Sequence, residues 1–174
     1  MLMKICISGL TGSGKTTLGA AISDELGIRH ISQSYKNAAV SDAKLLKMLE
    51  NTTARYALEF DENIIKESKH IDCVITTWHC PWIIKDATLR IWLDSDEKNR
   101  AYRLSKEKKK SIKYCIKYIR KKDALTAAQY RRAYHKDFDL SAIDIRINSD
   151  AVSVSEAVSV ISMLAMLRDK KKFA

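Results

Sequence analysis

Residues 9–16 of this 174-residue chain read GLTGSGKT, and these residue types at this spacing are typical of a loop that binds phosphate groups. The glycines allow the backbone to fold tightly around an anion, so that successive N–H groups can point inward. Lys15 is long enough to reach the β- and γ-phosphates of a nucleotide, and Thr16 offers a hydroxyl group to Mg²⁺. The pattern predicts that the chain binds ATP with Mg²⁺.

The residues on either side of this loop support the prediction over a chance match. An apolar run, residues 5–8, precedes the loop, and a helical pattern follows it. A helix that begins there directs its positive N-terminal end at the bound phosphate. We expect the donor nucleotide to contact Gly9, Leu10, Thr11, Gly12, Ser13, Gly14, Lys15, Thr16 and Thr17.

Enzymes with such a loop often hold Mg²⁺ with the help of an acidic residue, so a carboxylate is expected at the end of a central strand. The candidate strand 73–77 ends in Thr76 and Thr77 and carries no acid there. Asp94 follows the next candidate strand and is the candidate second metal ligand beside Thr16. An alternative is that Asp94 caps a helix, since residues 94–97 have capping-box spacing.

A strongly basic segment is the second candidate for chemistry. Residues 106–122 contain nine Lys or Arg and a single acid, Glu107. Cations on a mobile flap can stabilise the charge that spreads over oxygens during phosphoryl transfer, and can exclude water. The candidates are Arg120, Lys122, Arg131 and Arg132, which would converge if the helices that carry them fold back. The alternative is that they are solvated charges on the outer face of a helical hairpin.

The whole chain has a formal net charge of +10, which leaves a nucleic-acid partner open. In that alternative, the chain is a non-catalytic ATP-binding module whose basic segment contacts RNA or DNA. Only Tyr114 and Tyr118 lie among the lysines, so a stacking platform for bases is weak. We favour a kinase that acts on a small acceptor.

The cysteines and the hydrophobic runs suggest where the protein works. Cys6, Cys73, Cys80 and Cys115 form no Cys-x-x-Cys pair, as suits a reducing compartment. A zinc site built from His70, Cys73, His79 and Cys80 matches no common spacing, and buried thiols are preferred. No run reaches the ~20 apolar residues of a membrane span. We expect a cytoplasmic protein, and its oligomeric state is left open.

Apolar spacing indicates which elements position these residues. Strands are expected at 4–8, 28–32, 73–77, 89–93 and 143–148, and helices at 15–26, 41–50, 53–69, from about 94 through 104, and 155–167. Gly27 and Thr53 are expected to cap helices. Strands that alternate with helices predict an α/β fold with a mostly parallel sheet and ligands at the carboxyl ends of its strands. The segment 105–135 interrupts this alternation as a helical insertion.

Assembled in this order, the segments resemble the nucleoside monophosphate kinases, and most of all the archaeal-type cytidylate kinases. The resemblance spans nearly the whole chain. It is carried by the phosphate loop, by residues 26–28 followed by Ile31-Ser32, and by the three segments RAYRL at 100–104, IRKKD at 119–123 and YRRAYHKDFDLS at 130–141.

The resemblance implies a three-layer P-loop fold with a five-stranded parallel sheet in one domain, 1–174. The core would comprise 1–33, 70–104 and 140–168, with a monophosphate-binding helical segment at 34–69 and a basic lid at 105–139. The implied reaction transfers a phosphoryl group from ATP to CMP or dCMP. Arg103 would contact the donor nucleotide. The catalytic residues would be Lys15, Arg120, Lys122 and Arg131.

The chain departs from the family pattern mainly on the acceptor side. Where the family carries Glu-Gly-Arg, this chain has Thr76-Thr77-Trp78, and Ser34 to Asn37 replace a Gly-acidic-x-x-Arg pattern. We expect Ser34, Lys36 and Trp78 to contact the acceptor in their place. Lys122 replaces the second lid arginine, and lysine lacks the planar two-pronged phosphate contact of arginine. A different small acceptor on the same core therefore remains an alternative.

Overall fold

Five parallel strands form one sheet in the order β2-β3-β1-β4-β5, as expected from the alternating pattern. The computed structural model describes residues 2–32 and 41–170. The sheet order places β1, the strand that leads into the phosphate loop, at the centre. It is flanked by β3, which is followed by Thr76, and by β4, which ends at Asp94. The strands are β1 (Lys4–Gly9), β2 (Arg29–Ile31), β3 (Cys73–Ile75), β4 (Leu89–Asp94) and β5 (Ile145–Asn148).

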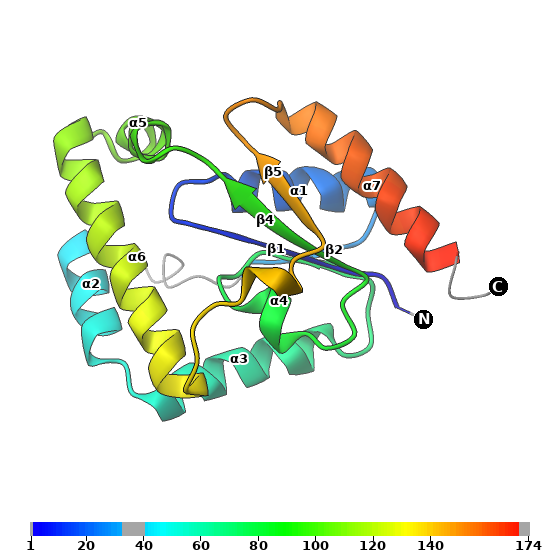
Figure 1. Ribbon diagram of the computed structural model, residues 1–174, viewed down its shortest axis with the longest axis horizontal. Helices are drawn as coiled ribbons and strands as arrows, with labels where there is room; N and C mark the ends of the chain where they lie inside the picture. The colour runs from blue at the N-terminus through cyan, green and yellow to red at the C-terminus, as the bar shows by residue number, and fades with distance from the viewer. Residues whose placement is uncertain (1, 33–40, 171–174) are drawn as a thin grey trace.

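Helices cover both faces of the sheet and make a three-layer α/β structure (Figure 1). On one face, α1 packs beside α7 over Ile5, Ile7 and Ile91. On the other, Ile64 of α3 packs with Cys6 and Ile75. The helices are α1 (Lys15–Leu26), α2 (Asp42–Asn51), α3 (Ala54–Ser68), α4 (Cys80–Ile83), α5 (Glu97–Lys108), α6 (Ile112–Tyr134) and α7 (Val154–Lys170).

A separate hydrophobic cluster holds the helices that lie beyond the end of the sheet. Leu45 and Leu49 of α2 pack with Leu104 of α5 and with Cys115 and Ile119 of α6. Cys115 and Ile119 thus lie on the face of α6 that is buried against α2 and α5. Its polar face is left to solvent.

Two of the expected helix caps are confirmed. Gly27 ends α1 with φ 63°, a left-handed conformation that glycine adopts without steric cost. The Thr53 side chain accepts a hydrogen bond from the backbone N–H of Tyr56 at the start of α3. Local chemistry alone therefore determined these two boundaries.

The expected capping box at residues 94–97 is wrong. The cap of α5 is Asp96, and its side chain makes no capping hydrogen bond. Asp94 instead completes β4, because it pairs in register with Asn148 of β5. Strand pairing takes precedence over local capping at this position.

The basic residues would converge only if the helices that carry them fold back, and no such turn separates them. Arg120, Lys122, Arg131 and Arg132 all lie on the single uninterrupted helix α6. At 1.5 Å per residue, the backbones of Arg120 and Arg131 are separated by about 16 Å along its axis. These four side chains therefore cannot meet by a turn within the segment.

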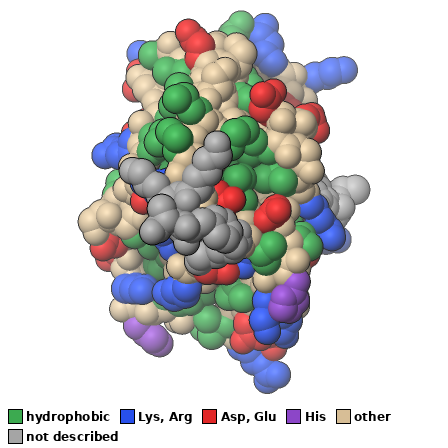
Figure 2. Space-filling model, turned by 90° about the vertical axis from the view of Figure 1, so that its right-hand side faces the viewer, with side chains coloured by type: hydrophobic (Ala, Val, Ile, Leu, Met, Phe, Trp, Pro, Cys, Tyr) green, Lys and Arg blue, Asp and Glu red, His purple; other side chains and the backbone are tan. Residues whose placement is uncertain are grey.

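Part of the positive charge of the described residues is engaged in ion pairs. Several cations of the basic segment have acidic partners: Lys108 pairs with Asp42, Arg120 with Glu97 and Lys121 with Glu50. On the face shown in Figure 2, Lys and Arg side chains lie in separate groups, with acidic and hydrophobic side chains between them. Over residues 2–32 and 41–170, no helix combines the length and apolar character needed to cross a membrane.

Candidate active site

The phosphate loop joins β1 to α1, and the surrounding backbone requires two of its glycines. A Cβ on Gly9 would lie 2.7 Å from the Leu93 carbonyl oxygen, and one on Gly12 would lie 2.9 Å from that of Arg100. Both glycines also have positive φ, 147° and 83°. Close approach of β4 and α5 therefore leaves no room for side chains here.

Lys15 is the first residue of α1, and its side chain reaches back to the backbone of the loop. Its Nζ donates hydrogen bonds to the carbonyl oxygens of Gly9 at 2.7 Å and Leu10 at 2.9 Å. The same Nζ lies 5.9 Å from the centre of the Trp78 ring, which follows β3. The Lys15 ammonium group thus lies near both the backbone of the loop and the Trp78 ring.

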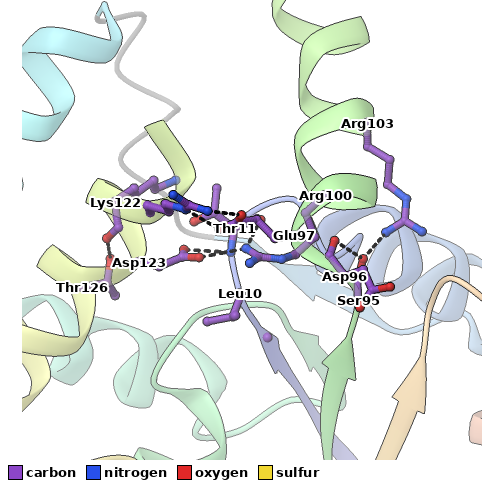
Figure 3. A network of polar contacts seen from close by, with 12 residues as sticks. Leu10, Thr11, Ser95, Asp96, Glu97, Arg100, Arg103, Lys122, Asp123 and Thr126 are labelled. Atoms are coloured by element: carbon purple, nitrogen blue, oxygen red, sulfur yellow. Dashed lines mark hydrogen bonds and ion pairs between the residues drawn. The ribbon is translucent and has the colours of Figure 1, made fainter. Parts of the chain in front are cut away.

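The loop is also fixed from α5 and α6 by a largely buried ion pair (Figure 3). Asp123 of α6 accepts a hydrogen bond from the Thr11 N–H at 3.0 Å. Arg100 of α5 donates to the Thr11 carbonyl oxygen at 3.0 Å and to the other oxygen of Asp123 at 2.8 Å. Both polar groups of the Thr11 backbone are therefore bound by residues that lie outside the loop.

A cavity of about 260 Å³ opens beside the loop. Its described lining carries the cations Lys15, Arg103 and Lys122 and the acids Asp61 and Glu107. The lining comes from the loop and α1 (Thr11, Gly12, Gly14, Lys15, Thr16, Thr17), α2 and α3 (Leu49, Ala57, Phe60, Asp61), the end of β3 (Thr76, Thr77, Trp78, His79), α5 (Arg103, Leu104, Glu107) and α6 (Lys122, Thr126, Gln129). It can hold a phosphate chain at one end and an organic group at the other.

A second cavity of about 160 Å³ lies on the far side of Arg103, between α1, β5 and the start of α7. Its lining is mostly apolar and includes Leu18, Ile147 and Val154. Gly14, Thr17 and Arg103 line both cavities. The two spaces are therefore neighbours across the phosphate loop, as the base and the phosphates of one nucleotide require.

A polar cluster fixes Arg103 between these cavities. Its guanidinium donates to the Ser149 carbonyl oxygen at 2.8 Å and forms an ion pair with Asp150. Burial acts to raise the pKa of Asp150. Hydrogen bonds from the Asp96 N–H and neighbouring side chains, together with the Arg103 charge, outweigh it and lower that pKa to about 2. The carboxylate thus remains charged and holds Arg103 in place.

Several sequence-predicted residues lie outside both cavity linings. Arg120 makes a two-pronged ion pair with Glu97, both contacts 2.7 Å, and its side chain is 68% exposed. Arg131 pairs with Asp137, and Arg132 donates to the Thr52 carbonyl oxygen. The oxygens of Asp94 accept hydrogen bonds from Arg146 and from the Trp92 indole. A direct role for Arg120, Arg131 or Asp94 in the reaction remains a prediction, and it requires these contacts to break.

Of the three residues predicted from the sequence to contact the acceptor, the structure describes only Trp78. Trp78 lines the larger cavity. Ser34 and Lys36 fall outside the described residues. Trp82, four residues after Trp78, packs against Phe138 with ring centres 4.6 Å apart. The four cysteines are buried free thiols, and among residues 2–32 and 41–170 no three His, Cys, Asp or Glu side chains gather in a way that could hold a metal ion.

The sequence analysis missed a buried polar network in the larger cavity. The Oδ2 atom of Asp61 lies 2.8 Å from His79 Nδ1 and accepts a hydrogen bond from the Tyr134 hydroxyl at 2.7 Å. Burial and the bond to Asp61 raise the pKa of Tyr134, so its hydroxyl remains a donor. One signal was available: Asp61 shares the buried face of α3 with Ala57 and Ile64, where an acid is unusual.

Comparison with known proteins agrees with this geometry. Residues 4–151 match the model of a family described as cytidylate kinase-like. A cytidylate kinase of Pyrococcus horikoshii is 29% identical over 164 residues, which cover 90% of this chain and 85% of that protein. A cytidylate kinase of Thermococcus kodakarensis is 30% identical over 152 residues, 83% of this chain and 78% of that protein.

Solved structures agree on the fold. A shikimate kinase from Bacteroides thetaiotaomicron superposes with a TM-score of 0.60 at 17% identity, covering 94% of this chain and 98% of that one. A deoxyadenosine kinase from M. mycoides gives 0.59 at 16% identity, covering 93% and 99%. At these identities the likeness establishes the P-loop kinase fold alone.

Proposed function

The chain belongs to the cytidylate kinase-like family, and from this membership we propose that it transfers the γ-phosphoryl group of ATP to a nucleoside monophosphate, CMP or dCMP. One observation carries the proposal within this chain. A single cavity of about 260 Å³ is lined both by the phosphate loop with Lys15 and by Trp78, whose ring centre lies 5.9 Å from the Lys15 Nζ atom.

On this proposal the donor nucleotide spans both cavities. Its base lies in the apolar space between α1, β5 and α7, and its phosphates cross the loop at Gly12 to Thr17. Arg103, which lines both spaces, contacts the donor at their junction. Lys15 exchanges the carbonyl oxygens of Gly9 and Leu10 for phosphate oxygens, which bind an ammonium group more strongly.

The loop also suits the Mg²⁺ ion that accompanies ATP. Thr16 lies in the first turn of α1 and lines the cavity. Mg²⁺ is usually bound through few protein groups together with substrate phosphates and water, so a hydroxyl and the phosphate chain are a suitable set. The ion would neutralise charge on the phosphates. Thr16 would orient it.

We assign the role of transition-state cation first to Lys122, because this lid residue lines the cavity. Arg120 and Arg131 are proposed to join it when the lid closes. Closure would exchange their present carboxylate partners for phosphate oxygens. We propose that 105–139 forms this lid, that 34–69 forms the monophosphate-binding segment, and that both serve one domain whose core comprises 1–33, 70–104 and 140–168.

The proposal is tested by identifying the acceptor. Purified protein should be supplied with ATP, Mg²⁺ and one of CMP, dCMP, UMP or AMP, and ADP formation should be measured. We expect the highest kcat/KM with CMP or dCMP. Turnover of none of these monophosphates, combined with turnover of a hydroxyl acceptor such as a nucleoside or a sugar, would contradict the proposal.

A further inference from the structure

A carboxylate with two hydrogen-bond partners lines the larger cavity together with the phosphate loop. Asp61 comes from α3, and its side chain is only 2% exposed. Its Oδ2 atom accepts the Tyr134 hydroxyl at 2.7 Å and lies 2.8 Å from His79 Nδ1. His79 and Tyr134 come from the segment after β3 and from α6, so three separate elements form this group.

Both partners bind the same oxygen, and this leaves the other oxygen available. A carboxylate only accepts hydrogen bonds, so Nδ1 of His79 carries the hydrogen in this contact. No hydrogen bond from the described residues reaches Oδ1 of Asp61. An acceptor that is buried without a partner is costly, whereas Asp61 lines the cavity, where a ligand can supply the missing donor.

The position of Asp61 indicates which part of the acceptor it meets. The transferring phosphoryl group lies near Lys15, so the phosphate of the acceptor must lie near the loop. The rest of the acceptor then extends toward Asp61 and Phe60 of α3 and toward Trp78, all of which line the same cavity. The aromatic side chains offer faces for a planar ring, and Asp61 offers an acceptor for a group on the edge of that ring.

We propose that Asp61 selects the base of the acceptor nucleotide. Its Oδ1 accepts a hydrogen bond from an exocyclic amino group, as cytosine presents. Uracil carries a carbonyl oxygen at the same ring position. Two hydrogen-bond acceptors would then face each other with no hydrogen between them, and their lone pairs would repel. His79 and Tyr134 act as positioning residues that fix the orientation of Asp61. This inference rests on the proposed function, of which it specifies the acceptor.

The two donors on Oδ2 make Asp61→Asn a directional test. In this variant the amide oxygen must take the Oδ2 position, because His79 and Tyr134 both donate there. The amide NH₂ group then faces the cavity and donates where the carboxylate accepted. The kcat/KM ratio of CMP to UMP should fall by about 10- to 100-fold, with UMP turnover gained or retained. Glu62→Gln changes an exposed carboxylate on the same helix and should leave the ratio unaltered.

The outcomes separate this inference from the proposed function. If the wild-type protein phosphorylates no monophosphate, the proposed function is wrong. If it phosphorylates UMP better than CMP, or if Asp61→Asn lowers both activities equally, the kinase function stands and the selection by Asp61 is overturned.

Thermal unfolding would establish that the Asp61→Asn variant is folded. If it is not, Tyr134→Phe provides a second test, because it removes one donor from Oδ2 and loosens the orientation of Asp61. The KM for CMP should then rise at least about threefold with little change in kcat, and the CMP-to-UMP ratio should fall. An unchanged ratio in this variant would equally overturn the inference.

Discussion

Asp123, on helix α6, accepts a hydrogen bond from the backbone N–H of Thr11 in the phosphate loop at 3.0 Å. The contact joins residues that are 112 positions apart in the chain. It links the element proposed to close over the substrates with the element proposed to hold the phosphates. Arg100 completes the link by binding both partners.

Replacing Asp123 by Ala is expected to destabilise the protein by about 3–5 kcal/mol, because Arg100, only 7% exposed, loses its counter-charge. Urea unfolding would measure the change. Asp137→Ala breaks the exposed pair with Arg131 and should alter the free energy of unfolding by no more than about 0.5 kcal/mol. Equal effects of the two variants would show that the Arg100–Asp123 pair has no special role.

Replacing Lys15 by Ala should abolish phosphoryl transfer and leave the fold intact. Lys15 donates hydrogen bonds to the backbone carbonyl oxygens of Gly9 and Leu10, and it supplies a positive charge at the proposed phosphate site. Steady-state ADP formation would measure the loss, and thermal unfolding would verify the fold. Lys98→Ala, an exposed lysine of α5, is the matched control. If the Lys15→Ala variant transfers the phosphoryl group at the wild-type rate, the proposed mechanism is contradicted.

Replacing Arg120 by Met tests whether this exposed lid arginine reaches the phosphates. If Arg120 leaves Glu97 during closure, kcat should fall at least about tenfold, with little change in the KM for either substrate. Arg55→Met removes a still more exposed arginine that pairs with Glu59 on α3, and it should have no such effect. If Arg120→Met has the same kcat as the control variant, Arg120 does not contribute to the transfer step, and any contribution of the proposed lid comes from other residues.

Asp150 should make the stability of the protein fall in acid. Its pKa is lowered from 3.8 to about 2 in the folded protein, so its contribution is fully present above about pH 4 and is lost as the pH falls toward 2. The expected loss is about 1–2 kcal/mol, reduced by its partial contact with water. Unfolding of wild type and Asp150→Asn between pH 5 and pH 2 would measure it. Parallel pH profiles for the two proteins would contradict this assignment.

Prediction from the sequence succeeded where the pattern is local. The phosphate loop, the alternation of strands and helices, the glycine cap of α1 and the threonine cap of α3 each depend on neighbouring residues, and all are present. Prediction failed where distant segments compete. Asp94 pairs with β5 instead of capping a helix, and the packing of the apolar face of α6 against α2 and α5 joins segments that are distant in the chain.

The sequence by itself determined the donor half of the site, since a phosphate loop is one continuous segment whose residue types are dictated by the anion it surrounds. It also determined the family, through motifs in a fixed order along the chain. Only the tertiary structure decided the site that we propose for the acceptor. Asp61, His79 and Tyr134 meet from three elements, and no spacing along the chain encodes their contact. A cavity is formed by packing, and packing brings together residues that the sequence keeps apart.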